Sequence, residues 1–455
     1  MSDGAPSTPD SLAAAGRNLP PQLAVELADG SPLTVGPVLR LLPGKRLAGL
    51  ARLGDRPVFA KLYFSSGAIR HGTREKRGIQ ALLAAGIPSP ALIHAEPWSI
   101  GGYAVVTACL PDAFPLDEGS ADEEVLAVFT LFGRLHRAGL IHRDAHLGNV
   151  LKSGGQLWLI DGDGIVPATE NERLDNLALL AAQMPGRWPE LAERALAAYG
   201  CPVATDDLAR RIARAEARRL SAYLAKTVRE CSEFSVSRSW ERFTVVRRDM
   251  VAQLAGLLAD PNAAMAGGNM LKDGGTCTVV RIDLDGLPVV VKRYNLKNSR
   301  HALSRAWRPS RAWHSWIEAQ RLIYYGIATP RPLAVVEGRF GPLRGRAYLV
   351  TAASDGRSLL DAWSADQLPP EDERTALLAL LAALRRFRIG HGDLKASNFL
   401  VGGGRIELID LDAASQFGSD RRYPRAWRRD RARLLANWPV ASPLHTWLDS
   451  SLPQA

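Results

Sequence analysis

One pattern of residues occurs twice in this sequence of 455 residues. In each copy an aspartate is followed by an asparagine five residues later and by a second aspartate seventeen residues later. The two sets are Asp144, Asn149 and Asp161, and Asp393, Asn398 and Asp410. Upstream, a lysine ends a strand-like run in each half, Lys61 in PVFAKLY and Lys292 in LPVVVKRY, and a similar turn follows later, GIPSPALI or GIATPRPL. Four matched landmarks in one order predict a duplicated domain.

The pattern of hydrophobicity is also the same in both halves. Residues 38–63 and 275–293 alternate apolar and polar residues between turn signals, which is typical of antiparallel strands. Helical periodicity then dominates in residues 123–139 and 372–390. The sequence therefore predicts an α+β protein in which each half has a small antiparallel β lobe followed by a compact helical lobe.

Breaks in this pattern indicate where the domains begin and end. The opening MSDGAPSTPDSLAAAGRNLPP has neither a basic start nor an apolar run, so we expect a flexible tail and no secretory signal. Between the halves, LLADPNAAMAGGNM contains a proline and paired glycines, which favour a linker. The predicted bounds are a flexible N-terminal tail at 1–36, a first domain at 37–235, a linker region at 236–268 and a second domain at 269–455.

The repeated residues suit phosphoryl transfer, which requires the protein to place charges and little covalent chemistry. An aspartate in a loop after a helix can accept or orient the hydroxyl proton of the acceptor. An asparagine and a later aspartate offer the oxygen ligands that Mg²⁺ prefers, and a strand lysine neutralises nucleotide phosphates. The expected bases are Asp144 and Asp393, the expected metal ligands are Asn149, Asp161, Asn398 and Asp410, and the expected phosphate contacts are Lys61 and Lys292.

Longer segments around these residues resemble a known family. HRDAHLGN and HGDLKASN resemble the catalytic loops of the protein-kinase-like superfamily, with IDGD and IDLD where many kinases carry Asp-Phe-Gly. VVVKRYNLKN, RAWRPSRAWHSW, GIATPRPLA and RAWRRDRARLLANW together resemble the lipopolysaccharide kinase family of Gram-negative bacteria, and the first half looks like another branch of it. This resemblance, over about residues 37–455, implies two tandem protein-kinase-like domains that use ATP and Mg²⁺ to phosphorylate a sugar hydroxyl of the lipopolysaccharide inner core.

The two halves depart from the family pattern at different points. The family places a glutamate eleven residues before the glycine of the GI-P turn, which is Glu75 in the first half. The second half has Ser315 there, and Glu318 lies one helical turn later on the same face. Either Glu318 replaces the glutamate, or the second site holds its lysine less well. Conversely, Gly274 and Gly275 in KDGGTCTVV would let a hairpin approach a phosphate, whereas the first half offers only PGKRLAG.

Charge and hydropathy give expectations about partners. A net charge of +10 indicates attraction to anions, and arginine-rich tracts at 293–311 and 421–433 match an anionic lipid-linked core oligosaccharide, with peripheral contact to the inner membrane. A solvated helix face is the alternative for these tracts. No RNA-binding motif accompanies their aromatic residues, so nucleic acid is not expected. The longest apolar run, at 376–384, is too short to cross a bilayer, and we expect a cytoplasmic protein without a transmembrane segment.

Two other hypotheses remain open at this point. One is a kinase of a protein or a small-molecule acceptor, because the fold does not fix the acceptor. The other is a pseudokinase pair that acts as a scaffold for envelope-assembly enzymes without transferring phosphate. The unequal glycine loops and helix carboxylates also predict that Asp144→Asn and Asp393→Asn affect activity unequally.

Overall fold

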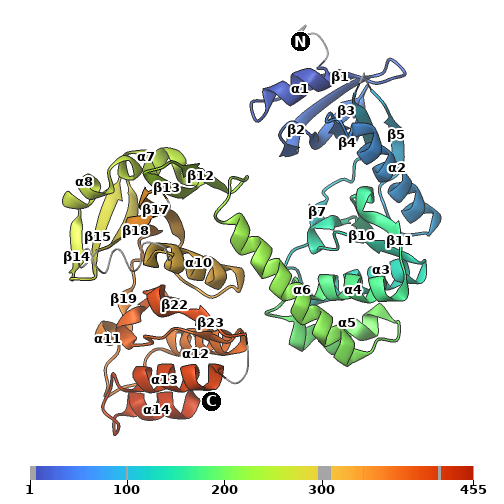
Figure 1. The fold of residues 1–455 in the computed structure, drawn as a ribbon. Coiled ribbons are helices and arrows are strands. Elements are labelled where there is room, and N and C mark those ends of the chain that lie inside the picture. The colour runs from blue at the N-terminus through green and yellow to red at the C-terminus, as the bar shows by residue number, and fades with distance from the viewer. Residues whose placement is uncertain (1–6, 99–100, 296–308, 342, 419–421, 454–455) are drawn as a thin grey trace. The chain divides into compact units, whose positions relative to one another are not determined.

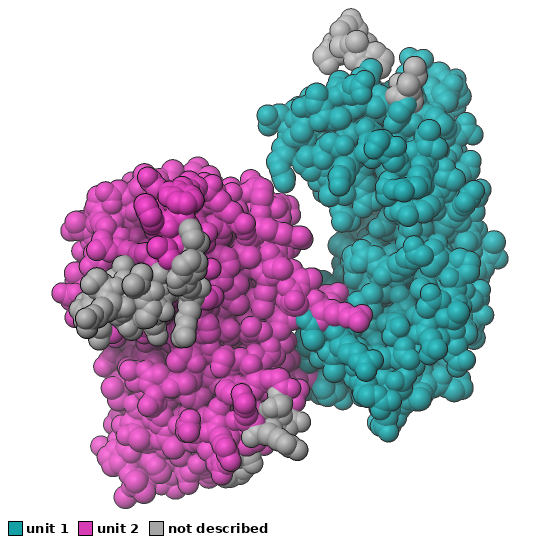
Figure 2. Space-filling model, viewed as in Figure 1, with its two compact units in different colours: residues 1–217 teal, residues 218–455 magenta. Residues whose placement is uncertain are grey.

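The computed structural model describes residues 7–98, 101–295, 309–341, 343–418 and 422–453. The chain forms two compact units, unit 1 at residues 1–217 and unit 2 at residues 218–455 (Figure 2). Each unit combines antiparallel sheets with helices, so the expected mixed α and β class with antiparallel strands is confirmed. None of the helices in these ranges is long and apolar enough to span a bilayer.

Unit 1 begins, within its described part, with a six-stranded antiparallel sheet of order β1-β2-β3-β4-β6-β5 (Figure 1). The strands are β1 (Leu23–Glu26), β2 (Pro32–Leu42), β3 (Arg46–Leu53), β4 (Arg56–Tyr63), β5 (Leu92–Glu96) and β6 (Tyr103–Ala108). Val58, Ala60 and Leu62 of β4 point to one face of the sheet and join a buried apolar cluster. Lys61 therefore points to the opposite face, because successive side chains in a strand alternate.

Helix α2 (Ala68–Ala84) packs on the face of the sheet that carries Lys61. Its residue Ile79 is buried in one cluster with Tyr63 of β4 and with Tyr103 and Val105 of β6. The helix is amphipathic, so this apolar contact fixes which of its residues face the sheet. The packing brings the middle of α2 opposite the end of β4.

The helical half of unit 1 contains α3 (Asp122–Arg137), α4 (Glu170–Ala181), α5 (Trp188–Tyr199) and α6 (Thr205–Lys226), with short strands β7 (Phe114–Pro115), β8 (Leu140–His142), β9 (Val150–Ser153), β10 (Gln156–Leu159) and β11 (Ile165–Pro167). Phe129 and Phe132 of α3 are fully buried in its core. Strand β8 pairs with β11, and β9 with β10. Asp144 thus follows β8, whereas Asp161 lies between the β9–β10 hairpin and β11.

The expectation of a flexible tail over residues 1–36 is wrong for its described part. Residues Pro9–Ala15 form α1, and β1 pairs with β2 in the sheet. Leu12, Leu23 and Val25 are buried in the cluster beneath the sheet. The physical reason is that a strand of only four residues can close an apolar face, and four alternating residues are a weak signal in a sequence.

Unit 2 repeats this order with a larger sheet. Its described part has a seven-stranded antiparallel sheet of order β12-β13-β17-β18-β16-β15-β14. The strands are β12 (Phe234–Arg238), β13 (Arg242–Arg247), β14 (Asn269–Asp273), β15 (Cys277–Leu284), β16 (Leu287–Tyr294), β17 (Pro332–Phe340) and β18 (Leu343–Ala352). Lys292 on β16 pairs with Leu349 on β18, as Lys61 on β4 pairs with Val105 on β6. Helix α10 (Arg311–Tyr324) follows β16 as α2 follows β4.

The expected linker at 236–268 is instead part of the folded body of unit 2. Strand β13 pairs with β17, and the helices α7 (Val251–Ala259) and α8 (Pro261–Ala266) bury Leu254 and Met265 in the core beneath the sheet. Pro261 begins a helix here because its lost N–H is not needed at the first helical position, where Asp260 caps the helix. The bounds 37–235 and 269–455 of the two kinase-like domains stay predictions.

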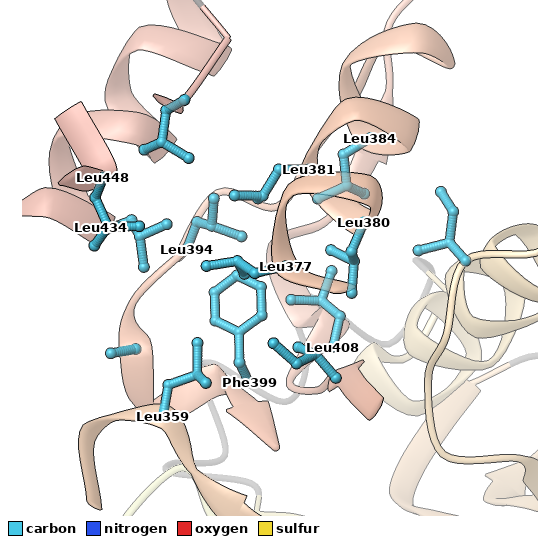
Figure 3. Packing of buried hydrophobic residues seen from close by; sticks show 14 of the residues in the cluster. Leu359, Leu377, Leu380, Leu381, Leu384, Leu394, Phe399, Leu408, Leu434 and Leu448 are labelled. Carbon is cyan, nitrogen blue, oxygen red and sulfur yellow. The ribbon is translucent and has the colours of Figure 1, made fainter. Parts of the chain in front are cut away.

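The helical half of unit 2 is built around α12 (Glu371–Arg386), α13 (Tyr423–Leu435) and α14 (Pro443–Ser451), with α11 (Leu359–Ala362) and short strands β19 (Arg357–Ser358), β20 (Ile389–Gly390), β21 (Phe399–Gly402), β22 (Arg405–Leu408) and β23 (Ser415–Gln416). Leu377 and Leu381 of α12 face Phe399 of β21 (Figure 3). Leu434 of α13 and Leu448 of α14 complete this core. The core fixes the loops after β20 and β22, which carry Asp393 and Asp410.

Candidate active sites

In unit 1, the structure brings three predicted residues together around the lysine of β4. Lys61 Nζ lies 2.6 Å from Glu75 Oε1 and 2.8 Å from Asp161 Oδ1. Burial alone would lower the pKa of Lys61, but the carboxylates of Glu75 and Asp161 raise it above its usual value. Burial likewise opposes ionisation of Asp161, yet Lys61 holds the pKa of that carboxyl well below its usual range. Lys61 and Asp161 are therefore both charged at neutral pH.

The carboxylate of Glu75 is only 1% exposed, so its charge must be paired and hydrogen-bonded. Besides Lys61, it accepts hydrogen bonds from the backbone N–H groups of Gly162, at 3.2 Å, and Asp163, at 2.9 Å. These N–H groups can reach Glu75 because the loop passes very close to α2. A Cβ atom at Gly78 would lie 1.9 Å from Gly162 O, so this close approach requires a glycine.

A cavity of about 670 Å³ lies against this group of charges. Its lining includes Lys61, Glu75, Asn149 and Asp161, and apolar side chains such as Leu47 and Ile160. The volume and the mixture of apolar walls with a few convergent polar groups are typical of small-molecule and cofactor sites. Unit 1 therefore has room for a ligand of nucleotide size beside Lys61.

The predicted metal ligands Asn149 and Asp161 both line this cavity. The side-chain N–H of Asn149 donates to Asp144 O at 2.9 Å, which leaves the amide oxygen available as an acceptor. In the described part of the chain, no three His, Cys, Asp or Glu residues are grouped to hold a metal. Two oxygen donors fit Mg²⁺ better than a metal that needs a full protein cage, because Mg²⁺ keeps waters and takes phosphate oxygens as ligands.

The predicted base of unit 1, Asp144, has few contacts. Its side chain is 69% exposed, and its nearest charged partner is His146, with Nε2 at 3.6 Å from Asp144 Oδ2. The nearby ring of His146 lowers the pKa of Asp144. The ring of His142 lies with Nε2 at 3.0 Å from Ile160 O, so this histidine fixes the loop next to Asp161.

In unit 2, Lys292 is also held by two carboxylates. Its Nζ lies 2.6 Å from Asp410 Oδ1 and 2.9 Å from Asp412 Oδ1. Burial would lower the pKa of Lys292, but Tyr294, Asp412 and Asp410 raise it above its usual value. Burial opposes the charge on Asp410 too, and Lys292 nevertheless lowers the pKa of that carboxyl. A contact between the strand lysine and the late aspartate is thus present in both units.

The hypothesis that Glu318 holds Lys292 is wrong. Glu318 is buried and pairs with Arg321, whose Nε lies 2.9 Å from Glu318 Oε2. Arg321 in turn donates to Gln416 Oε1 at 2.8 Å, so the pair faces β23. The second carboxylate on Lys292 comes from Asp412, which the sequence analysis missed. The available signal was the second acid of IDLD, at the position where many kinases carry glycine.

The glycines of the predicted phosphate-binding hairpin lie in the turn between β14 and β15. The N–H of Gly274 donates to Cys277 O at 3.1 Å, and the side chain of Asn295 donates to Gly274 O at 3.1 Å. A Cβ atom at Gly275 would meet nothing within 4 Å, so the turn has open space beside it. Contact of Gly274 and Gly275 with a phosphate stays a prediction.

The predicted base of unit 2, Asp393, lies between two cations. Arg433 Nη1 is 2.7 Å from Asp393 Oδ1, and Lys395 Nζ is 3.2 Å from Asp393 Oδ2. Burial opposes the charge, but Lys395 and Arg433 lower the pKa of Asp393. The side-chain N–H of Asn398 donates to Asp393 O at 2.8 Å, which repeats the contact between Asn149 and Asp144.

A buried carboxylate on α13 supports this loop. Asp430 Oδ2 accepts a hydrogen bond from the N–H of His391 at 2.7 Å, and Asp430 Oδ1 accepts one from the N–H of Gly392 at 3.0 Å. The sequence analysis assigned Asp430 and Arg433 only to an arginine-rich tract. Their contacts show that this tract also positions the loop that carries Asp393.

Comparisons with known proteins add a family match to this geometry. Residues 272–436 match the model described as the Lipopolysaccharide kinase (Kdo/WaaP) family. A search of curated proteins gives no match to this sequence. Residues 272–436 contain Gly274, Gly275, Lys292, Asp393 and Asp410.

Three solved structures are similar to part of this chain. WaaP in complex with acyl carrier protein is 21% identical, with a TM-score of 0.32, and the alignment covers 42% of this chain and 79% of that chain. A choline/ethanolamine kinase family protein from Mesorhizobium loti is 16% identical, with a TM-score of 0.32 and the same coverage of 42% and 79%. Vaccinia related kinase 3 is 11% identical, with a TM-score of 0.26, over 34% of this chain and 55% of that chain. The segment of unit 2 that carries Lys292, Asp393 and Asp410 is thus the part of this chain that matches the lipopolysaccharide kinase family.

Proposed function

We propose that the chain is an ATP- and Mg²⁺-dependent phosphotransferase made of two tandem protein-kinase-like domains. Its proposed acceptor is a sugar hydroxyl of the lipopolysaccharide inner core. The observation that carries the proposal is the 2.6 Å contact between Lys292 Nζ and Asp410 Oδ1, within the segment 272–436 that matches the family model. The same pair occurs in unit 1 as Lys61 and Asp161, at 2.8 Å.

In unit 2, each proposed role follows from the contacts of the side chain. Lys292 is charged and is held at the end of β16, where it would bind nucleotide phosphates. Asp410 and the amide oxygen of Asn398 would hold Mg²⁺, which neutralises phosphate charge when bound. The lowered pKa of Asp393 keeps its carboxylate ionised at neutral pH, so it can orient the acceptor hydroxyl and accept its proton.

Unit 1 is proposed to bind a nucleotide as well. Its cavity of about 670 Å³ has Lys61, Asn149 and Asp161 in its lining, which are the residues expected to meet phosphates and Mg²⁺. Its base, Asp144, is far more exposed than Asp393 and lacks two flanking cations. We therefore assign the main transfer activity to unit 2 and a binding role, with weaker transfer, to unit 1.

The acceptor side of the proposal draws on the arginines of α13. Arg425, Arg428, Arg429 and Arg433 are exposed on this helix, whereas Trp427 faces the core. Arg433 contacts Asp393, and exposed guanidinium groups on this helix suit an anionic, lipid-linked core oligosaccharide and the anionic surface of the inner membrane. Residues 296–308 of the first arginine-rich tract and residue 421 of the second lie outside the described residues.

The experiment uses the full chain with labelled ATP, Mg²⁺ and purified core oligosaccharide as acceptor. We expect labelled phosphate on the glycan, its loss on Lys292→Ala, and no comparable loss on Lys152→Ala, because Lys152 pairs with Glu124 and not with the proposed site residues. Transfer to protein or to a small molecule but not to glycan would replace the acceptor. Nucleotide binding without transfer to any acceptor would favour the pseudokinase scaffold instead.

A further inference from the structure

We propose that Asp412 is the positioning residue that holds Lys292 in unit 2, in place of the helix carboxylate that holds Lys61 in unit 1. This inference deepens the proposed function, because it identifies how the phosphate-contacting lysine of the second site is kept in place. The carboxylate that pairs with the lysine lies on a helix in unit 1, whereas in unit 2 it lies on the loop that follows the proposed metal ligand. The following contacts carry the inference.

Two tyrosines show that Ser315 stands where unit 1 has Glu75. Each tyrosine lies two residues after the strand lysine. The hydroxyl of Tyr63 donates to Glu75 Oε2 at 3.4 Å, and the hydroxyl oxygen of Tyr294 lies 3.2 Å from Ser315 Oγ. Ser315 is 2% exposed, so the position is as buried as that of Glu75. The serine cannot supply the negative charge that a buried ammonium group requires.

Asp412 supplies that charge and collects the donors around it. Its Oδ1 lies 2.9 Å from Lys292 Nζ and accepts hydrogen bonds from Tyr294 OH and Ser315 Oγ, both at 2.7 Å. Its Oδ2 lies 3.4 Å from Arg311 Nη2. The side chain of Asp412 is 12% exposed. Asp412 therefore links β16, which carries Lys292, with helix α10, which carries Ser315 and Arg311.

The equivalent residue of unit 1 has a different partner. Asp163 lies two residues after Asp161, as Asp412 lies two residues after Asp410. Arg74 Nε is 2.6 Å from Asp163 Oδ1, and the Asp163 N–H donates to Glu75 Oε2 at 2.9 Å. Asp163 thus connects the loop with α2, whereas the helix carboxylate pairs with the lysine.

The glycines around the loop explain why the two units differ. In unit 1, Gly78 and Gly162 let the loop lie against α2, so its N–H groups can reach Glu75. Unit 2 has Glu318 and Leu411 at the corresponding places, three residues after Ser315 and one residue after Asp410. The side chains of Glu318 and Leu411 leave no room for that close approach. In unit 2 the loop carries its own carboxylate, Asp412, which contacts both the lysine and the helix.

The test exploits this equivalence with a set of matched variants. Asp412→Asn removes the charge in unit 2, and Asp163→Asn makes the same change at the matched position of unit 1. The exchange Ser315→Glu with Asp412→Ser moves the carboxylate of unit 2 from the loop to the helix, as in unit 1. All variants are made in the full chain, and thermal unfolding reports whether they fold.

Two readouts follow each lysine separately, by mass spectrometry of the peptides that contain Lys61 and Lys292. The first is acylation by an acyl phosphate of ATP, which requires a bound nucleotide. The second is the pH dependence of acylation by a small amine reagent without nucleotide, which reports the state of each lysine alone. The second readout tests the role of Asp412 even if the first shows that neither unit binds ATP, so the two proposals fail separately.

We expect Asp412→Asn to slow nucleotide-dependent acylation of Lys292 by at least about tenfold, because Lys292 Nζ is no longer held in place beside the bound nucleotide. Lys292 should also react with the amine reagent at lower pH, whereas Lys61 should keep its wild-type behaviour in both readouts. Asp163→Asn should leave both lysines near wild type, and the exchange variant should restore Lys292. Wild-type behaviour of Lys292 in a folded Asp412→Asn protein, or failure of a folded exchange variant to restore it, would overturn the proposal.

Discussion

Units 1 and 2 place the same charges around a strand lysine but take one of them from a different element. In unit 1 the two carboxylates are Glu75 on α2 and Asp161 on the loop. In unit 2 both carboxylates, Asp410 and Asp412, come from one loop. In each unit a mostly buried ammonium group has two carboxylate partners, because an unpaired buried charge is costly. The two units therefore keep two carboxylates around the lysine, although one of these carboxylates comes from a different position in the chain.

The loops that carry the proposed bases differ more strongly. Asp393 is one-third exposed and lies between Lys395 and Arg433, whereas Asp144 is mostly exposed and has His146 as its nearest charged partner. Asp430 also anchors the unit 2 loop by its backbone N–H groups. In unit 1, Asn176 occupies a similar place and donates from its side chain to His142 O at 2.6 Å. The unit 2 loop is the more highly charged of the two.

The largest expected effect concerns these two bases. We expect Asp393→Asn to lower the rate of phosphate transfer by at least about 10²-fold, because the general base that orients the acceptor is lost. Asp144→Asn should lower the transfer rate less, because the carboxylate of Asp144 is exposed and is not held between two cations. Transfer kinetics of the two variants with saturating Mg-ATP measure the difference. Equal losses would show that the two loops are equivalent or obligately coupled.

The units should also respond differently to acid. His136 on α3 is buried, and burial lowers its pKa to about 4, although its contact with Asn176 opposes the shift. Below pH 6.5 this histidine binds a proton in the unfolded chain but not in the folded unit. The free energy of unfolding is therefore constant above pH 6.5 with respect to this group, and it decreases as the pH falls from 6.5 to 4. The expected loss is about 3 kcal/mol. Arg385 holds the corresponding place on α12, so this histidine has no counterpart in unit 2.

Hydrogen exchange in the full chain measures this difference, because peptides from α3 and α12 report the two units separately. Protection of the α3 peptides should decrease on acidification toward pH 4 more than that of the α12 peptides. His136→Gln should flatten the decrease in unit 1. An unchanged pH dependence of the α3 peptides in this variant would remove His136 as the cause.

The smallest effect concerns the close approach of α2 to the loop. We expect Gly78→Ala to destabilise unit 1 by about 1–3 kcal/mol, because the added methyl group would overlap Gly162 O. The control is Gly256→Ala in α7, where an added Cβ would meet nothing within 4 Å and helix propensity favours alanine. Hydrogen exchange of the α2 and α7 peptides measures both changes. Equal stability of the two variants would argue against the close approach.

The sequence predicted the main features of each site. Alternation placed Lys61 and Lys292 near the ends of β4 and β16, and the repeated spacing singled out Asp161 and Asp410, which the structure places within 2.8 Å of these lysines. These predictions succeed because the period of a strand and the length of a short hairpin are local properties. The roles of these residues in binding nucleotide and Mg²⁺ stay predictions.

Other features depended on packing that no local pattern reveals. From the sequence, either Glu318 or Asp412 could pair with the lysine of the second site. The rotation of α10 and the path of the loop decide that Asp412 reaches this lysine. Similarly, the proline that suggested a linker begins α8, because Asp260 caps that helix. The four-residue strand β1 was too short to be recognised by alternation.

The central claim is that the repeated lysine, asparagine and aspartate residues of each unit gather around a nucleotide and its metal ion. The most direct measurement is a crystal structure with a non-hydrolysable ATP analogue and Mn²⁺ in place of Mg²⁺, in which anomalous scattering locates the metal. We predict a metal peak between Asn398 and Asp410 with a phosphate on Lys292, and an equivalent peak between Asn149 and Asp161. A nucleotide bound away from Lys61 and Lys292, or metal peaks away from both pairs, would contradict this account.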